Sequence, residues 1–162
     1  MWYFVLALLV VVVDQFTKFW VVERFALHET VEVIPGFFNL TYLTNTGAAF
    51  GILAGQPTWW RQVFFVCVAV AALTAIVLLF RRLRAESRWY GPALALIAGG
   101  AVGNLIDRVR QGAVIDFFDF YVGTYHWPAF NIADSAITVG VAIIMMINLF
   151  CVQGNGDDAA KQ

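Results

Sequence analysis

Four apolar stretches in this chain are each close to the ~20 residues that a helix needs to cross a lipid bilayer. They cover residues 2–22, 62–80, 89–106 and 132–152. Hydrophobic residues make up 61% of the chain and charged residues 13%, whereas soluble domains have roughly 45–50% and about 25%. The sequence therefore predicts one all-α polytopic membrane domain over residues 1–152. The polar segment 153–162 is predicted to be a disordered tail.

Positive charge gathers between the second and third stretches, in a loop that contains Arg81, Arg82, Arg84 and Arg88. Arginine-rich loops stay in the cytoplasm. With four spans, both termini are then predicted to be cytoplasmic, and the connections 23–61 and 107–131 to face outward.

The first outward connection contains two strand-like segments, TVEVI at 30–34 and FNLTYL at 38–43, separated by Pro35 and Gly36. Both segments carry β-branched or aromatic residues, and the dipeptide between them favours a turn. We expect a small extracytoplasmic β-sheet between the first and second helices. The segment VIDFFDFYVG in the second outward connection is also extended in character.

Several kinds of function are excluded by what the sequence contains. The net charge of −1 provides no basic surface for nucleic acid. Cys67 and Cys151 lie within apolar runs, and His28 and His126 are isolated, so neither a metal site nor a cofactor site is expected. The two serines are not in the GxSxG context of a serine hydrolase. Among hydrolytic schemes, only carboxylate chemistry remains.

Asp14 and Lys18 are ionisable residues in the first helix, spaced four apart in the order that favours an ion pair. Charged groups at membrane depth are costly and therefore functional candidates. Mutual neutralisation and a role in a functional site both explain this pair.

The third helix ends in GGAVGNLIDR at residues 99–108. Gly99 and Gly103 have the spacing of close helix packing. Asn104, Asp107 and Arg108 share one side of the helix end and indicate either a charged helix stop or a site that holds substrate.

Asp134 follows Asn131 by three residues at the start of the fourth helix, a spacing that is typical of a capping box. Asp116, or its rival Asp119, lies in the loop that returns over the same helices. Two carboxylates brought together cannot both ionise easily, so one keeps a proton and the pair can act as acid and base toward water. In an extended strand only one of Asp116 and Asp119 can face Asp134.

These segments together resemble the lipoprotein signal peptidase (signal peptidase II) family. The resemblance rests on VVVDQFTK at 11–18, LTNTGAAFG at 43–51, GGAVGNLIDR at 99–108, VIDFFDFY at 114–121 and FNIADSAI at 130–137. It implies a membrane aspartyl endopeptidase of the bacterial inner membrane with its site at the periplasmic face. The implied catalytic pair is Asp116 and Asp134, and Asp119 is then expected to be an outward, solvated carboxylate near the lipid headgroups. The positions implied to shape the site or hold substrate are Asp14, Lys18, Asn45, Gly47, Asn104, Asp107, Arg108 and Asn131.

The resemblance also implies the substrate and the inhibitors. Family members remove the signal peptide from diacylglyceryl-modified prolipoproteins just before the lipidated cysteine, within the lipid bilayer and without a metal or cofactor, and globomycin-type cyclic peptides inhibit them. The alternative is a small ion-coupled transporter that uses intramembrane carboxylates. The crowding of the acids at one face argues against it. A purely structural membrane module would leave the clustered Asn, Asp and Arg residues unexplained.

Overall fold

The computed structural model describes residues 2–47, 55, 58–83 and 87–159. It contains four long helices: α1 (Trp2–Arg24), α2 (Trp59–Leu83), α3 (Tyr90–Gln111) and α4 (Ile132–Ala159). All four are long and apolar enough to cross a membrane, α4 over Ile132–Leu149. The predicted four-helix membrane fold is therefore confirmed. Arg84 and residues 48–51 of the LTNTGAAFG motif lie outside the described residues.

Two helix ends differ from the sequence-based expectation. Asp107 and Arg108 do not stop α3, which continues to Gln111 and ends at Gly112. Gly112 adopts a left-handed conformation (φ 76°), and its N–H is bonded to the Arg108 carbonyl, an ending for which glycine is favoured. α4 is helical to Ala159, past residue 152 at which the fourth apolar stretch ends. Extending an existing helix gains a hydrogen bond for each residue that is fixed, whereas starting one is costly.

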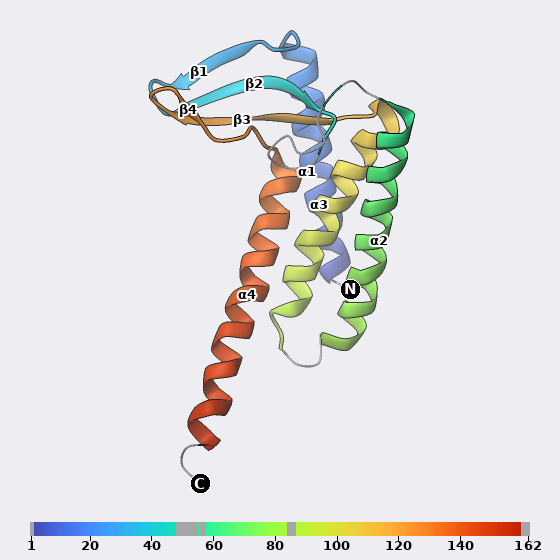
Figure 1. The fold of residues 1–162 in the computed structure, drawn as a ribbon, viewed down its shortest axis with the longest axis vertical. Helices are drawn as coiled ribbons and strands as arrows, with labels where there is room; N and C mark the ends of the chain where they lie inside the picture. Colours follow the sequence, from blue (N-terminus) through green and yellow to red (C-terminus); the bar gives the residue numbers. More distant parts are fainter. Residues whose placement is uncertain (1, 48–54, 56–57, 84–86, 160–162) are drawn as a thin grey trace.

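An antiparallel sheet covers one end of the helices (Figure 1). Its strands are β1 (Thr30–Ile34), β2 (Phe38–Asn45), β3 (Val114–Val122) and β4 (Tyr125–His126), in that order across the sheet. The two predicted strands and their turn are present, with Gly36 at φ 75° in the turn. The sheet is larger than expected because β3 and β4, from the connection between α3 and α4, join it. β3 pairs with β2, which lies far from it in sequence.

The pairing of β2 with β3 fixes where the two rival aspartates lie. Asn39 is opposite Asp119, and Leu43 is opposite Asp116. Three steps along β2, from Leu40 to Leu43, match two steps along β3, so β2 contains one extra residue there. Such a bulge bends the strand and increases its twist. Asp116 therefore lies near the start of β3, close to the end of α3, and Asp119 lies further along the strand, away from α3.

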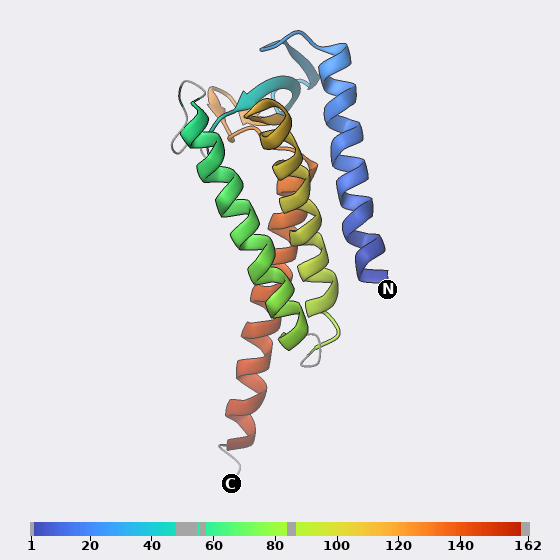
Figure 2. The same ribbon diagram turned by 90° about the vertical axis from the view of Figure 1, so that its right-hand side faces the viewer.

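The third helix is central to the bundle. α3 contacts each of the other helices, with α1 and α2 on its opposite sides (Figure 2). Close packing depends on glycine: a Cβ at Gly99 would lie 2.7 Å from the Ala7 carbonyl oxygen, and one at Gly100 would lie 2.4 Å from that of Ala133. The predicted packing role of the Gly99 and Gly103 spacing is confirmed, although Gly103 faces the Asp14 carboxylate.

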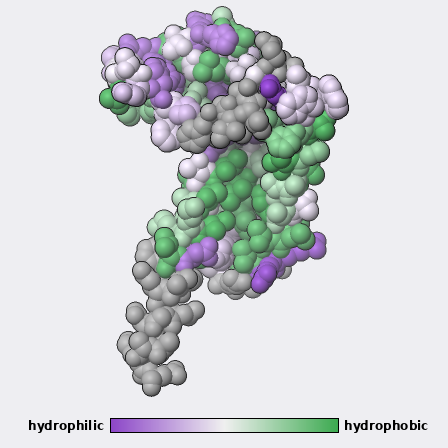
Figure 3. All heavy atoms as spheres, viewed as in Figure 1, coloured by the Kyte–Doolittle hydropathy of each residue, from purple (hydrophilic) through white to green (hydrophobic). Residues whose placement is uncertain are grey.

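The outer surface of the helices is apolar. In Figure 3 an apolar band separates the polar sheet end from polar side chains at the opposite end. Large hydrophobic side chains such as Phe4, Phe16 and Leu78 are more than 60% exposed, whereas several charged side chains are buried within the bundle. This reversal is expected of a protein whose surrounding solvent is lipid. The start of α1, the end of α2, the start of α3 and the end of α4 lie away from the sheet (Figure 1).

Candidate active site

A fully buried lysine holds the bundle together near the sheet. Lys18 on α1 is only 1% exposed. Its ammonium nitrogen lies 2.9 Å from Asp14 Oδ2 and 2.7 Å from Asp107 Oδ2, and it donates to Asn104 Oδ1 at 3.0 Å. The predicted Asp14–Lys18 ion pair is therefore present. Asp107 is a second carboxylate partner of Lys18, so the three residues form a triad. Because the triad has one positive and two negative charges, its remaining oxygens need hydrogen-bond donors.

Those donors come from other elements. Asp14 Oδ1 accepts the Ala133 N–H at 2.9 Å, in the first turn of α4, where free backbone N–H groups favour an anion. Gln15 donates to Asp107 Oδ1 at 2.9 Å, and the Ile115 N–H donates to Asp107 Oδ2 at 3.3 Å. Sequence reasoning missed Gln15, although an amide side chain at membrane depth was a usable signal. The triad thus joins α1, α3, α4 and the start of β3.

Two asparagines connect this triad to the aspartates. Asn104 Nδ2 donates to Asp134 Oδ1 at 2.8 Å, while its oxygen accepts from Lys18. Asn131, which is 0% exposed, donates to Asp116 Oδ1 at 2.8 Å. Each aspartate is therefore held by an amide side chain that is itself fixed.

The predicted capping box at the start of α4 is present. The Asp134 N–H donates to Asn131 Oδ1 at 2.9 Å, and the Asn131 N–H donates to Asp134 Oδ2 at 3.3 Å. Asp134 is thus a helix cap and, at the same time, lines a pocket. The two interpretations that the sequence left open are compatible, because capping fixes the carboxylate where a substrate can reach it.

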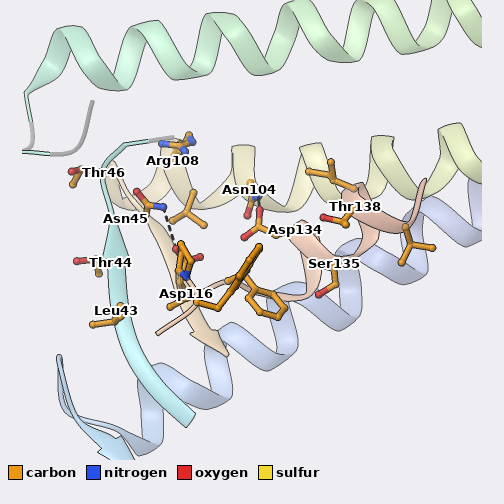
Figure 4. Close-up of a pocket in the computed structure, with 17 residues that line it drawn as sticks. Leu43, Thr44, Asn45, Thr46, Asn104, Arg108, Asp116, Asp134, Ser135 and Thr138 are labelled. Atoms are coloured by element: carbon orange, nitrogen blue, oxygen red, sulfur yellow. Dashed lines mark hydrogen bonds between the residues drawn. The ribbon is translucent and has the colours of Figure 1, made fainter. Parts of the chain in front are cut away.

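The other side of Asp116 faces the end of β2. Asn45 Nδ2 donates to Asp116 Oδ2 at 3.2 Å, and Asn45 Oδ1 accepts the Gly47 N–H at 2.9 Å (Figure 4). The Arg108 guanidinium donates to the Gly47 carbonyl at 2.8 Å and lies 4.4 Å from the Phe65 ring centre. Arg108 therefore anchors the segment after β2 through a charged hydrogen bond and a cation–π contact.

Asp116 and Asp134 line one pocket of about 760 Å³. Its walls come from β2, α3, the start of β3, the segment before α4 and the first turns of α4 (Figure 4). Sequence reasoning found the Asn, Asp and Arg residues of this pocket but missed the rest of its lining, which is Leu43, Thr44, Thr46, Val114, Trp127, Pro128, Ala129, Phe130, Ser135, Ile137, Thr138 and Val139. A volume of this size accommodates a peptide segment.

The electrostatics of the pocket favour a proton on Asp116. Burial raises the pKa of Asp116 to about 7, and the nearby Asp134 charge adds to this effect. Hydrogen bonds from Asn45 and Asn131 oppose the shift only in part. Near neutral pH a large share of molecules therefore carries a neutral Asp116 beside Asp134, which accepts N–H bonds from Asn104 and Asn131.

Asp119 differs from the expectation. As predicted, strand alternation separates it from Asp116, and it does not line the pocket. It is not a solvated surface carboxylate, however, because it is only 8% exposed. It accepts a hydrogen bond from Asn39 and contacts His126, which is therefore not an isolated residue. The expectation failed because it did not foresee that β4 and Asn39 cover this face of β3.

Within the described ranges, no group of three or more His, Cys, Asp or Glu side chains is placed to hold a metal ion. The carboxyl groups of Asp116 and Asp134, which line the pocket, can transfer protons.

Comparison with known proteins identifies the family. A family model described as signal peptidase (SPase) II matches residues 6–150. The chain belongs to the signal peptidase II family. A lipoprotein signal peptidase of Syntrophus aciditrophicus is 51% identical over 85% of the chain and 86% of the relative, and one of Geobacter sulfurreducens is 53% identical over 82% of each. A bacterial membrane enzyme solved by the in meso method superposes with a TM-score of 0.85 at 37% identity, covering 94% of this chain and 90% of the other.

Membership of this family makes the chain an aspartic-type peptidase and a multi-pass membrane protein, as the resemblance implied. It also decides against the alternative function, a small ion-coupled transporter. The buried acids of α1 and α3 are bound to Lys18, and Asp107 also accepts the Ile115 N–H at the start of β3, which suits a structural support better than a path across the bilayer.

The triad predicts an order of stability for variants at Asp14 and Lys18. Lys18→Met leaves two buried carboxylates without a cation and should destabilise the protein most, by about 3–5 kcal/mol or more. Asp14→Asn leaves the Lys18–Asp107 pair and an oxygen for the Ala133 N–H, so it should cost least. The double variant leaves only Asp107 unpaired and should fall between them. Thermal unfolding and folded yield measure this order; a double variant as stable as the unaltered protein would show that Asp107 is not a partner.

Proposed function

We propose that the pocket cleaves the signal peptide from diacylglyceryl-modified prolipoproteins just before the lipidated cysteine, with Asp116 and Asp134 as the catalytic pair. The observation that carries the proposal is that these two carboxylates line the same pocket although they come from β3 and α4. Lipoprotein signal peptidase is the name that the curated relatives bear.

The two carboxylates divide the chemistry between them. Asp134, as the base, takes a proton from a water molecule whose oxygen attacks the scissile carbonyl carbon. Neutral Asp116 gives its proton to the carbonyl oxygen, so the intermediate is a neutral gem-diol. Asp116, now ionised, then recovers a proton from a hydroxyl of the gem-diol while Asp134 protonates the amide nitrogen. The C–N bond breaks, and the two carboxyl groups return to their starting protonation states.

Substrate binding follows from the walls of the pocket. The apolar α4 side chains Ile137 and Val139 and the end of β2 border it from opposite sides. We infer that the signal helix lies along the lipid-facing side of the pocket, that its extended end passes below β2, and that the acyl chains of the cysteine stay in the adjacent leaflet. A globomycin-type cyclic peptide would compete for the same space.

In this proposal, Asn45 and Arg108 do not act mainly as hydrogen-bond donors to the substrate. Arg108 is already engaged with Gly47, and Asn45 with both Gly47 and Asp116. They shape the wall that the substrate meets. The Lys18 triad supports Asp134 through Asn104.

The catalytic assignment predicts a sharp loss of turnover in two variants. Replacing an aspartate by asparagine keeps its shape but removes proton transfer. Asp116→Asn and Asp134→Asn should each lower kcat by at least about a hundredfold while the protein still folds. The exposed carboxylate of Glu23 supplies the matched control, because Glu23→Gln should keep full activity.

Cleavage of a lipidated precursor per folded molecule is the measurement. An active Asp116→Asn variant would remove Asp116 from the catalytic pair. The rival assignment predicts an inactive Asp119→Asn, whereas we expect that variant to retain turnover at saturating substrate.

The raised pKa of Asp116 predicts how kcat/KM changes as the pH rises above neutral. Asp116 donates a proton, and its raised pKa means that it is protonated below about pH 7 and ionised above it. The kcat/KM value should therefore decrease as pH rises through about 7, with an apparent pKa that belongs to the coupled pair. A kcat/KM that increases between pH 7 and 8.5, in protein that stays folded, would contradict this role.

We infer that the sheet and the pocket face the periplasm and that both chain ends face the cytoplasm of a bacterial inner membrane. The arginines at 81, 82, 84 and 88 support this orientation. In a background lacking Cys67 and Cys151, a membrane-impermeant thiol reagent added to spheroplasts should label Tyr125→Cys but not Arg88→Cys. Labelling of only Arg88→Cys would reverse the orientation.

A further inference from the structure

One buried carboxylate among the described residues belongs neither to the Lys18 triad nor to the pocket. Asp119 accepts a hydrogen bond from Asn39 Nδ2 at 2.8 Å, on the neighbouring strand. His126 Nδ1 lies 2.8 Å from Asp119 Oδ1 and 3.1 Å from Oδ2. Since Nδ1 faces a carboxylate, it carries a hydrogen and donates. The His126 ring also stacks on Tyr121, with ring centres 5.0 Å apart and planes 10° apart.

His126 is the last residue of β4 and directly precedes the pocket wall formed by residues 127–130. This wall runs back along β3. The Trp127 N–H donates to the Phe120 carbonyl at 2.7 Å, and Phe130 exchanges two backbone hydrogen bonds with Phe118. The wall is therefore fixed to β3 at both of its ends.

Between its attachment points at Trp127 and Phe130, the wall is one residue longer than the part of β3 that lies beside it. The step from Phe120 to Phe118 spans two residues of β3, whereas the step from Trp127 to Phe130 spans three residues of the wall. The wall therefore has one extra residue, in a bow that contains Pro128 and Ala129, as in a β-bulge. Proline has no N–H with which to bind the strand. Both of these residues line the pocket, so the shape of the bow is part of the substrate-binding surface.

The two ends of the bow have different consequences for the site. The Phe130 end is bonded to β3 by main-chain groups and continues directly into Asn131 and the first turn of α4. The His126 end has fewer main-chain bonds close to the pocket: the Trp127 N–H bond to Phe120 and the short pairing of β4 with β3 hold it, and the side-chain contact of His126 with Asp119 adds to them. Loosening the His126 end would therefore alter the wall while leaving Asp134 and its cap in place.

We propose that Asp119, supported by Asn39, positions the pocket wall 127–130 through His126 and thereby sets how tightly the prolipoprotein is held. His126 and Asp119 are positioning residues, because they act through the wall. The proposal rests on the proposed function, since the effect is on substrate binding at that same pocket.

Two substitutions at His126 separate its hydrogen bond from its ring. His126→Phe keeps a ring to stack on Tyr121 but cannot donate to Asp119. We expect it to raise KM for a lipidated precursor about three- to tenfold, with kcat changed less than about twofold. His126→Asn keeps an N–H donor near the position of Nδ1 and should restore KM to within about twofold.

Variants at Asp119 repeat the comparison from the other side. Asp119→Ala removes the acceptor and should raise KM as His126→Phe does. Asp119→Asn keeps an acceptor for His126, and a rotated Asn39 amide can accept from its new N–H group. It should stay close to the unaltered enzyme. Tyr125→Phe, at a neighbouring side chain that is 85% exposed, is the control and should change neither constant.

A second measurement does not require cleavage. Amide hydrogen exchange at Trp127 should be faster in His126→Phe than in the unaltered protein and slow again in His126→Asn, while exchange at Ala133 and Asp134 stays unchanged. An unchanged KM and unchanged Trp127 exchange in His126→Phe would overturn the proposal, as would a loss of kcat alone. If the unaltered enzyme failed to cleave any lipidated precursor, the proposed function would be refuted, and the exchange data would still decide whether His126 anchors the wall.

Discussion

The buried ammonium group of Lys18 is the interaction on which the rest of the molecule depends. It lies between Asp14 and Asp107 in a bundle that is surrounded by lipid, where water cannot compensate an unpaired charge. The remaining oxygens of the two carboxylates accept N–H groups from α4, from Gln15 and from the start of β3. The groups that compensate the Lys18 charge therefore bring together the elements that form the pocket. Helices that met only through apolar side chains could slide along one another. The paired charges instead fix the helices in a single register.

The triad also determines how the aspartates are presented. Asn104 receives a hydrogen bond from Lys18 and gives one to Asp134, and Asn131 caps α4 while binding Asp116. Both carboxylates are held before substrate arrives, so little reorganisation is needed during the reaction. Burial and the nearby charge of Asp134 raise the pKa of Asp116 to about 7 and so favour a proton on Asp116. A four-helix bundle covered by a sheet can in this way place acid–base chemistry at the edge of a bilayer.

Much of this was predictable from the sequence because the bilayer restricts what each residue can do. Length and hydropathy predicted the four helices, and the rarity of charge at membrane depth drew attention to Asp14, Lys18 and the Asn104–Arg108 group. The position of Asp134 followed from the capping pattern. Contacts between distant segments were not predictable: nothing local shows that β3 pairs with β2, that Asp107 is a second partner of Lys18, or that Asn39 and His126 bury Asp119. Strand alternation separated Asp116 from Asp119, but only the family resemblance selected Asp116.

The central claim is that the scissile bond lies between Asp116 and Asp134. The most direct measurement is a structure of the Asp134→Asn variant with an uncleaved lipidated precursor bound. We expect the carbonyl group preceding the lipidated cysteine to lie within about 3.2 Å of the Asp116 carboxyl group, with residue 134 on its other side and room for one water. A complex in which that carbonyl lies outside the pocket, away from both residues, would contradict it.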